Sequence, residues 1–236
     1  GKRIVTVLFT DGEAGIVRND YPARNLSPSE LAEIRVRETE GALAYLGSES
    51  YVRLGLENHP YGSTTEELSR EEVLSDWGGE EALVDTLAGL IRGYTPELVV
   101  SPVSDFELHE HFEHKTVGYL AERAVARLHE EGAEFPRGHI KVIDPLWRDL
   151  YPRYTAVPVM PSDETGPGSL PSEGLPSESL PPPRAVQGKA LQQHRTQGDA
   201  SIIALERIPF FMHEYYHAEI WNLPAGVDEY ISGDAR

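Results

Sequence analysis

The chain has 236 residues and no cysteine, so disulfides and thiolate chemistry are excluded and any metal ion must be bound by His, Asp or Glu. Its net charge is −18, which disfavours nucleic acid and anionic membranes as partners, because binding to either depends on Lys and Arg that neutralise phosphates. No apolar run approaches the roughly 20 residues that cross a bilayer. We therefore expect a cytoplasmic protein with a small-molecule or protein partner.

Strands and helices are expected to alternate in the first part of the chain. The β-branched apolar run at 2–10 is typical of a strand buried on both faces, and it ends in the turn-rich loop TDGEAG at 10–15. A capping-box pattern at 27–30 predicts the start of a helix that stops at Gly47. A second strand is expected at 51–56.

The alternation continues through the middle of the chain. A helix is expected at 80–92 and a strand at 97–104. An amphipathic helix should follow, with its apolar stripe over 117–128, and a fourth strand is expected at 139–147. This order predicts an α/β fold, a Rossmann-like three-layer sandwich with a mostly parallel sheet.

The amino-acid composition changes at a Pro-rich segment, residues 158–184. Its composition predicts a surface insertion within a single domain that covers residues 1–236. The sequence pattern is again typical of a helix at 186–197. The chain then reaches the aromatic segment FFMHEYYHAEIW, which is expected to dock into the core as a helix or a strand.

The segment ELHEHFEHKTVG, at 107–118, is rich in histidine and glutamate and includes His109, His111 and His114. It follows a predicted strand, and ligands of open α/β sheets bind at the carboxyl ends of the strands. Counting back along the apolar stripe predicts that His114 faces inward, beside Glu113. These residues fit a divalent metal site with a proton-transferring partner, whereas a solvated loop ahead of a helix would explain the same spacing.

Two further patterns have both a functional and a structural interpretation. HEYYH at 213–217 matches the H-E-x-x-H motif of zinc peptidases, which requires a helix and a third ligand. Arg35 and Glu38 lie three residues apart on the first predicted helix. An ion pair that fixes this helix against a loop is the simplest interpretation, and an arginine that holds a polar substrate is the alternative.

Taken in order, six segments resemble motifs of the LmbE-like (PIG-L) de-N-acetylase family. They are VTVLFTDGEAG, IRVRETEGALAYLG, IRGYTPELVVSP, HFEHKTVG, GKALQQHRTQ and YHAEIW. In HFEH, Phe112 and Glu113 stand where the family motif H-P-D-H has Pro and Asp. The order and rough spacing agree over nearly the whole chain, apart from the Pro-rich segment.

The resemblance implies a zinc-dependent hydrolase that removes an N-acetyl group from an N-acetylglucosamine-type sugar or sugar conjugate. His114 would bind Zn²⁺, and His111 would stabilise the oxyanion or protonate the leaving amine. Glu113 would orient one of these histidines, and Arg35 would face the substrate. The zinc ion would polarise the acetamide carbonyl and activate its bound water.

The chain departs from the family in one respect. The family segment A-H-P-D-D-E, which supplies two zinc ligands and the general base, has no counterpart here. We therefore expect the fold to lack its first strand and helix, which would leave two strand edges open. The chain is then an incomplete copy, which we favour, or a non-catalytic carbohydrate-binding or scaffold domain, or it builds a rewired site with His109. Whether it forms a homo-oligomer is left open.

Overall fold

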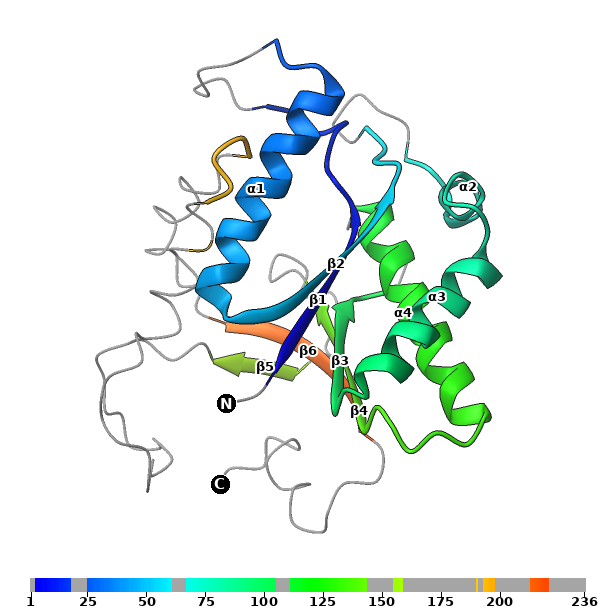
Figure 1. Ribbon diagram of the computed structural model, residues 1–236. Helices are drawn as coiled ribbons and strands as arrows, with labels where there is room; N and C mark the ends of the chain where they lie inside the picture. The colour runs from blue at the N-terminus through cyan, green and yellow to red at the C-terminus, as the bar shows by residue number, and fades with distance from the viewer. Residues whose placement is uncertain are drawn as a thin grey trace, which may run out of the picture. The chain divides into compact units, whose positions relative to one another are not determined.

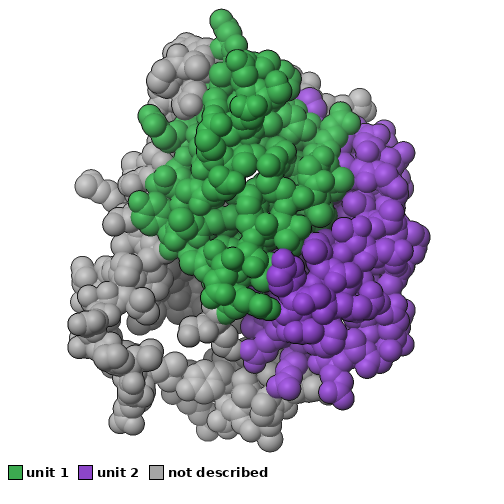
Figure 2. All heavy atoms as spheres, in the orientation of Figure 1, with its two compact units in different colours: residues 1–58, 158–212 green, residues 59–157, 213–236 purple. Residues whose placement is uncertain are grey.

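The computed structural model describes residues 3–17, 25–60, 67–104, 111–143, 155–158, 190, 193–197 and 213–220. The chain divides into two compact units, coloured separately in Figure 2. Unit 1 contains residues 1–58 and 158–212, and unit 2 contains residues 59–157 and 213–236. Each unit is therefore built from two separate stretches of the sequence, and the single domain expected over 1–236 stays a prediction. His109 and nearly all of the Pro-rich segment lie outside the described residues.

The regular elements in the described part of unit 1 form a β-α-β arrangement. β1 (Ile4–Thr10) and β2 (Ser48–Leu56) pair in parallel, and α1 (Pro28–Leu46) connects them (Figure 1). A parallel pair needs such a crossover, because the second strand must start at the same end of the sheet as the first.

The ends of α1 lie where the sequence predicts them. The Ser27 hydroxyl accepts a hydrogen bond from the Glu30 amide, and the Glu30 carboxylate accepts from the Ser27 amide at 2.8 Å. These bonds form a capping box. A hydrogen bond from the Ser27 hydroxyl to the Glu30 carboxylate at 2.6 Å and, second, the bond from the Ser27 amide lower the pKa of the Glu30 carboxyl. The helix ends at Gly47, which has a left-handed backbone with φ of 70°. The buried face of α1 carries Leu31, Arg35, Glu38 and Ala42.

The described part of unit 2 has three helices that pack through α4. They are α2 (Arg70–Asp76), α3 (Glu80–Tyr94) and α4 (Phe112–Glu130), and α4 contacts both of the others as well as β3. The short helix α2 was not predicted from the sequence. No helix in the described part of the chain is long and apolar enough to span a membrane.

The sheet of unit 2 is mixed, with the order β3-β4-β6-β5. β3 (Leu98–Pro102) runs parallel to β4 (Gly138–Ile143), and β6 (His213–Ile220) runs antiparallel to β4. β5 (Thr155–Pro158) lies next to β6. The HEYYH segment is thus part of a strand, and the peptidase interpretation is wrong because H-E-x-x-H places its two histidines on one face of a helix.

The described sheets are small, and the two outer strands of each sheet pair on one side only among the described strands. Among the described strands, β1 pairs only with β2, and β3 pairs on one side only, with β4. The mixed α/β fold class with parallel strands is confirmed, and the expected lack of a first strand and helix stays a prediction.

The contact between α4 and β3 depends on a glycine. A methyl group at Gly118 would lie 2.5 Å from the carbonyl oxygen of Pro102 and 2.8 Å from the carbonyl group of Val103. These are backbone atoms and cannot rotate away, so only glycine allows the helix to approach the strand this closely. The first turns of α4 are therefore held directly against the end of β3.

We predict that Gly118→Ala lowers the free energy of unfolding by about 1–3 kcal/mol, because the added methyl group forces α4 away from β3. The matched control is Gly89→Ala on α3, where a methyl group meets nothing within 4 Å. This control should gain up to about 1 kcal/mol from the higher helix propensity of alanine. Urea denaturation measures both values, and equal changes in the two variants would contradict the packing argument.

Candidate functional site

The loop that follows β1 is closed by Arg35 of α1. The Gly15 amide donates to the Gly12 carbonyl at 3.1 Å, and Gly12 has a φ of 75°. Arg35 donates from Nη1 to the Gly12 oxygen at 2.7 Å and from Nη2 to the Ile16 oxygen at 3.2 Å. A methyl group at Gly15 would lie 1.9 Å from Nη1, so the guanidinium fills the space that this glycine leaves. Arg35 therefore fixes the helix against the loop, with backbone carbonyls as its partners.

Polar side chains from the region of β2 hold the same loop. The side-chain oxygen Oδ1 of Asn58 accepts from the Ala14 amide at 3.1 Å, and the backbone amide of Asn58 donates to Oε1 of Glu13 at 2.7 Å. Arg53 binds Asp11 through two hydrogen bonds, of 3.0 and 2.5 Å. The second oxygen of Glu13 is buried and has no hydrogen-bond partner among the residues that the structure describes. The loop at the carboxyl end of β1 is thus ordered in advance, with one carboxylate oxygen that lacks a donor.

Glu38, one helical turn from Arg35, binds a segment far along the chain. Its Oε1 accepts from the Thr196 amide at 2.8 Å, and its Oε2 accepts from the Thr196 hydroxyl at 2.7 Å. Glu38 is 8% exposed and Thr196 is fully buried. The two hydrogen bonds satisfy a buried carboxylate, which would otherwise be costly to remove from water. They also anchor the segment 193–197, part of the predicted K-x-x-A-L-x-x-H-x-x-Q stretch, to α1.

The first turn of α4 in unit 2 carries the predicted histidines. His111 is the N-cap, and its Nδ1 accepts a hydrogen bond from the Glu113 amide at 3.1 Å. Because Nδ1 accepts, the hydrogen of a neutral His111 ring is on Nε2. The rings of His111 and His114 lie side by side, with centroids 5.1 Å apart and planes tilted by 31°. The structure thus brings His111 and His114 together.

The prediction that His114 faces inward is wrong. His114 is exposed, whereas Glu113 is buried. Steps of four residues back from Leu128 reach Leu120, Thr116 and Phe112, so the apolar stripe passes beside His114. The inward position is taken by the carboxylate instead of the imidazole.

The buried carboxylate of Glu113 binds His59, which sequence reasoning did not identify. Oε1 of Glu113 accepts from the His59 amide at 2.6 Å and lies 2.9 Å from His59 Nδ1. The other ring nitrogen, Nε2, lies 3.1 Å from Oδ2 of Asp76 at the end of α2. The ring sits against Trp77 and Phe112, with centroid separations of 6.4 and 6.1 Å. A histidine between two carboxylates thus joins the first turn of α4 to the end of α2.

Comparison with known proteins identifies the family. The sequence model of the PIG-L family, described as GlcNAc-PI de-N-acetylase, matches residues 1–125, which include β1, the Arg35 loop and the first turns of α4. The chain belongs to the PIG-L family. The resemblance recognised in the sequence is thereby confirmed. No curated protein matches the chain.

Two solved structures share the fold. An N,N′-diacetylchitobiose deacetylase from Pyrococcus horikoshii matches with 19% identity and a TM-score of 0.52, over 92% of this chain and 73% of that one. GalB, the 4-carboxy-2-hydroxymuconate hydratase from Pseudomonas putida KT2440, matches with 12% identity and a TM-score of 0.56, over 94% of this chain and 86% of that one. One of these proteins is a hydrolase and the other a hydratase, so the likeness shows the fold and leaves the reaction undecided.

A zinc ion is expected for a PIG-L deacetylase, and the described side chains show whether its ligands are present. A catalytic zinc site uses three protein ligands and an open position. The described residues contain no cluster of three or more His, Asp or Glu side chains that could hold a metal ion. His111 uses Nδ1 to cap α4, and the carboxylate of Glu113 binds His59. The described part of the chain therefore does not fit a complete zinc site.

We predict that Thr196→Val destabilises the protein by about 1–3 kcal/mol, because it removes a hydroxyl donor from a buried carboxylate while keeping the shape of the side chain. Thr196→Ser keeps the hydroxyl and is the matched control, which should lose much less. Urea denaturation with a limited-proteolysis readout at the segment 193–197 measures both. A valine variant as stable as the serine variant would show that the bond to Glu38 is dispensable.

Proposed function

We propose that the protein is a hydrolase that removes an N-acetyl group from an N-acetylglucosamine-type sugar or sugar conjugate. The observation that carries the proposal is the PIG-L match over residues 1–125, because this range contains His111, Glu113 and His114. The chitobiose deacetylase, a protein of the same fold, is named for an N-acetylated sugar. Because a hydratase shares the fold too, the proposed reaction rests on the family and not on the architecture.

His111 is the proposed catalytic residue. In amide hydrolysis a water oxygen attacks the acetyl carbonyl carbon, the carbonyl oxygen becomes negatively charged, and the amine takes up a proton as the C–N bond breaks. Since Nδ1 of His111 accepts from the helix, Nε2 is the nitrogen that can donate to the oxyanion or to the leaving amine. Its position at the N-terminus of α4 supports this role, because the helix dipole there favours negative charge.

His114 is the metal ligand that we propose for α4. Its imidazole is exposed and lies beside His111, so it can reach an ion that does not enter the core. Because the described residues do not complete a zinc site, the remaining ligands would come from outside them. Glu113 supports the pair from the buried side of the helix, where its carboxylate is committed to His59.

Arg35 is proposed to serve the substrate through the loop that it holds. Its Nη1 and Nη2 bind the carbonyls of Gly12 and Ile16, which fixes the loop at the end of β1. Among the described residues, one carboxylate oxygen of Glu13 in this loop is buried without a hydrogen-bond partner, which marks the loop as polar. Arg35 is thus the proposed substrate-binding residue, and its hydrogen bonds to Gly12 and Ile16 order the loop beside it.

We predict that the protein releases acetate and free amine from an N-acetylglucosamine conjugate when Zn²⁺ is supplied, and that His111→Ala lowers kcat about 10²–10⁴-fold through the loss of proton transfer. His114→Ala should weaken Zn²⁺ binding, measured by calorimetric titration, as well as turnover. His111→Ala should bind the metal as the wild type does.

The control for both variants is His129→Gln at the other end of α4, which should leave turnover and metal binding unchanged. Sugar binding without any amine release in excess Zn²⁺ would overturn the hydrolase and support the non-catalytic carbohydrate-binding alternative. Unaltered Zn²⁺ affinity in His114→Ala would remove this residue from the metal site.

A further inference from the structure

We infer that His59 is a positioning residue for the proposed reaction: it holds the first turn of α4, and with it His111 and His114, through the carboxylate of Glu113. The inference rests on the proposed function for its catalytic meaning. The geometry on which it is built lies within unit 2 and stands independently of that function.

The contact between His59 and Glu113 is double and buried. One carboxylate oxygen, Oε1, receives both the backbone amide of His59 at 2.6 Å and its ring Nδ1 at 2.9 Å. His59 is 7% exposed and Glu113 is 6% exposed. In such surroundings a hydrogen bond to a carboxylate is stronger than in water, and a broken one leaves a buried charge without donors. Rotation of the Glu113 side chain therefore requires that both bonds break together.

The far side of the ring is fixed as well. His59 Nε2 lies 3.1 Å from Oδ2 of Asp76, which is half-exposed at the end of α2. Trp77 is buried against the ring, and Phe112 meets it edge-on. The imidazole thus has polar partners at both nitrogens and aromatic neighbours, so its orientation is determined by α2 and α4 together.

The position of Glu113 affects His111 and His114 directly, through the helical backbone and a hydrogen bond. Glu113 lies between His111 and His114 in sequence, and its amide donates to His111 Nδ1 at 3.1 Å. The Lys115 amide donates to the His111 carbonyl at 3.1 Å and closes the first helical turn. A shift of Glu113 therefore moves the hydrogen-bond donor that sets the His111 ring, and with it the Nε2 that faces the reacting atoms.

The two ring nitrogens of His59 can be tested separately. In asparagine the amide nitrogen stands near the position of Nδ1, so His59→Asn keeps a donor for Glu113. In glutamine the amide nitrogen stands near Nε2, so of the two ring contacts His59→Gln keeps only that with Asp76, while the backbone amide bond to Glu113 is common to all variants. His59→Ala loses both. If His59 acts through Glu113, asparagine should rescue the site and glutamine should not.

The experiment uses the full chain with labelled histidines and records the imidazole resonances of His111 and His114 by NMR, together with kcat and KM. His59→Ala and His59→Gln should shift both sets of resonances and lower kcat about 10- to 100-fold. KM should change less than about threefold, because these variants alter the orientation of the histidine rings and leave substrate binding intact. His59→Asn should stay close to the wild type in both readouts. The control is His129→Gln.

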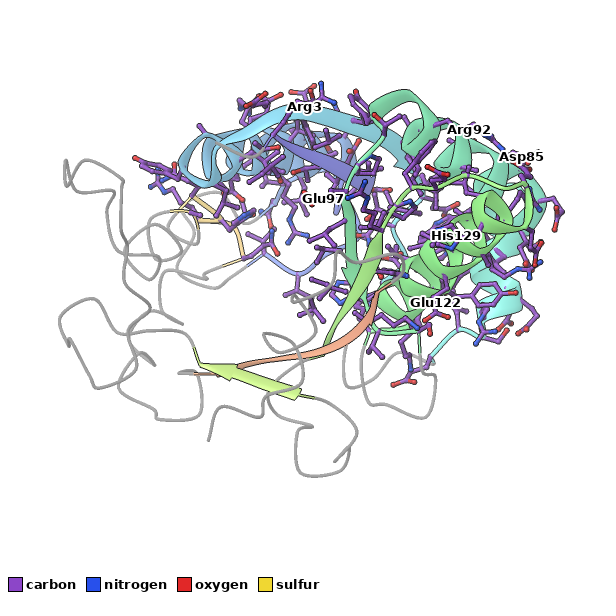
Figure 3. The ribbon with its side chains drawn as sticks, turned by 90° about the horizontal axis from the view of Figure 1, so that it is seen from below. Arg3, Asp85, Arg92, Glu97, Glu122 and His129 are labelled. Atoms are coloured by element: carbon purple, nitrogen blue, oxygen red, sulfur yellow. The ribbon has the colours of Figure 1, made fainter. Side chains whose placement is uncertain are left out.

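His129 is a suitable control because it lies on the same helix, near its C-terminal end, where it is labelled in Figure 3. Its Nε2 lies 3.0 Å from the Pro136 carbonyl, so His129→Gln also perturbs a histidine hydrogen bond of α4. Resonances of His111 and His114 that respond equally to changes at His59 and His129 would reveal a general loosening of α4 and overturn the inference.

The remaining outcomes separate the inference from the proposed function. Unchanged resonances in His59→Gln, or an asparagine variant no closer to the wild type than the glutamine variant, would refute positioning through Glu113. If the alanine variant does not fold, the comparison between asparagine and glutamine still decides. A wild type without turnover would reject the hydrolase, whereas the resonances would still test the role of His59.

Discussion

A carboxylate that is buried in the first turn of a helix must be matched by hydrogen-bond donors, and in this protein that requirement organises the candidate site. Glu113 meets it with the amide and ring of His59, 54 residues earlier in the chain. The first turn of α4 is thereby joined to the segment that follows β2 and to α2, and Gly118 fixes the next turn of α4 against β3. The exposed side of that turn can then present His111 and His114 from a rigid base.

Unit 1 uses the same principle on a different helix. The buried stripe of α1 includes two charged residues, Arg35 and Glu38, which reach in different directions. Arg35 satisfies carbonyls of the loop after β1, and Glu38 accepts both donors of Thr196, a residue 158 positions away. In both units a charged side chain within an apolar stripe holds a loop or a distant segment. Such charged residues interrupt the apolar face of a helix, yet their hydrogen bonds determine where chain segments without regular structure are placed.

The sequence was sufficient for features whose signals are local. The capping pattern at 27–30 located the start of α1, and the same pattern at 69–72 marks α2 and could have revealed it. The direction of His114 was not predictable from an apolar stripe alone, because an error of one residue turns a helical side chain by about 100°. His59 carries no local signal at all. Its role depends on a contact with Glu113, which forms only when distant segments fold together.

The edges of β1 and β3 that have no partner among the described strands bear on association between molecules. Each edge carries exposed apolar side chains, Ile4 on β1 and Leu98 and Val100 on β3, and each is joined to a described strand on one side only. A backbone edge of this kind can pair with a strand of another molecule. The net charge of −18 opposes such encounters, but this repulsion is screened as ionic strength rises. A rise in ionic strength would therefore weaken the charge repulsion that keeps such edges apart.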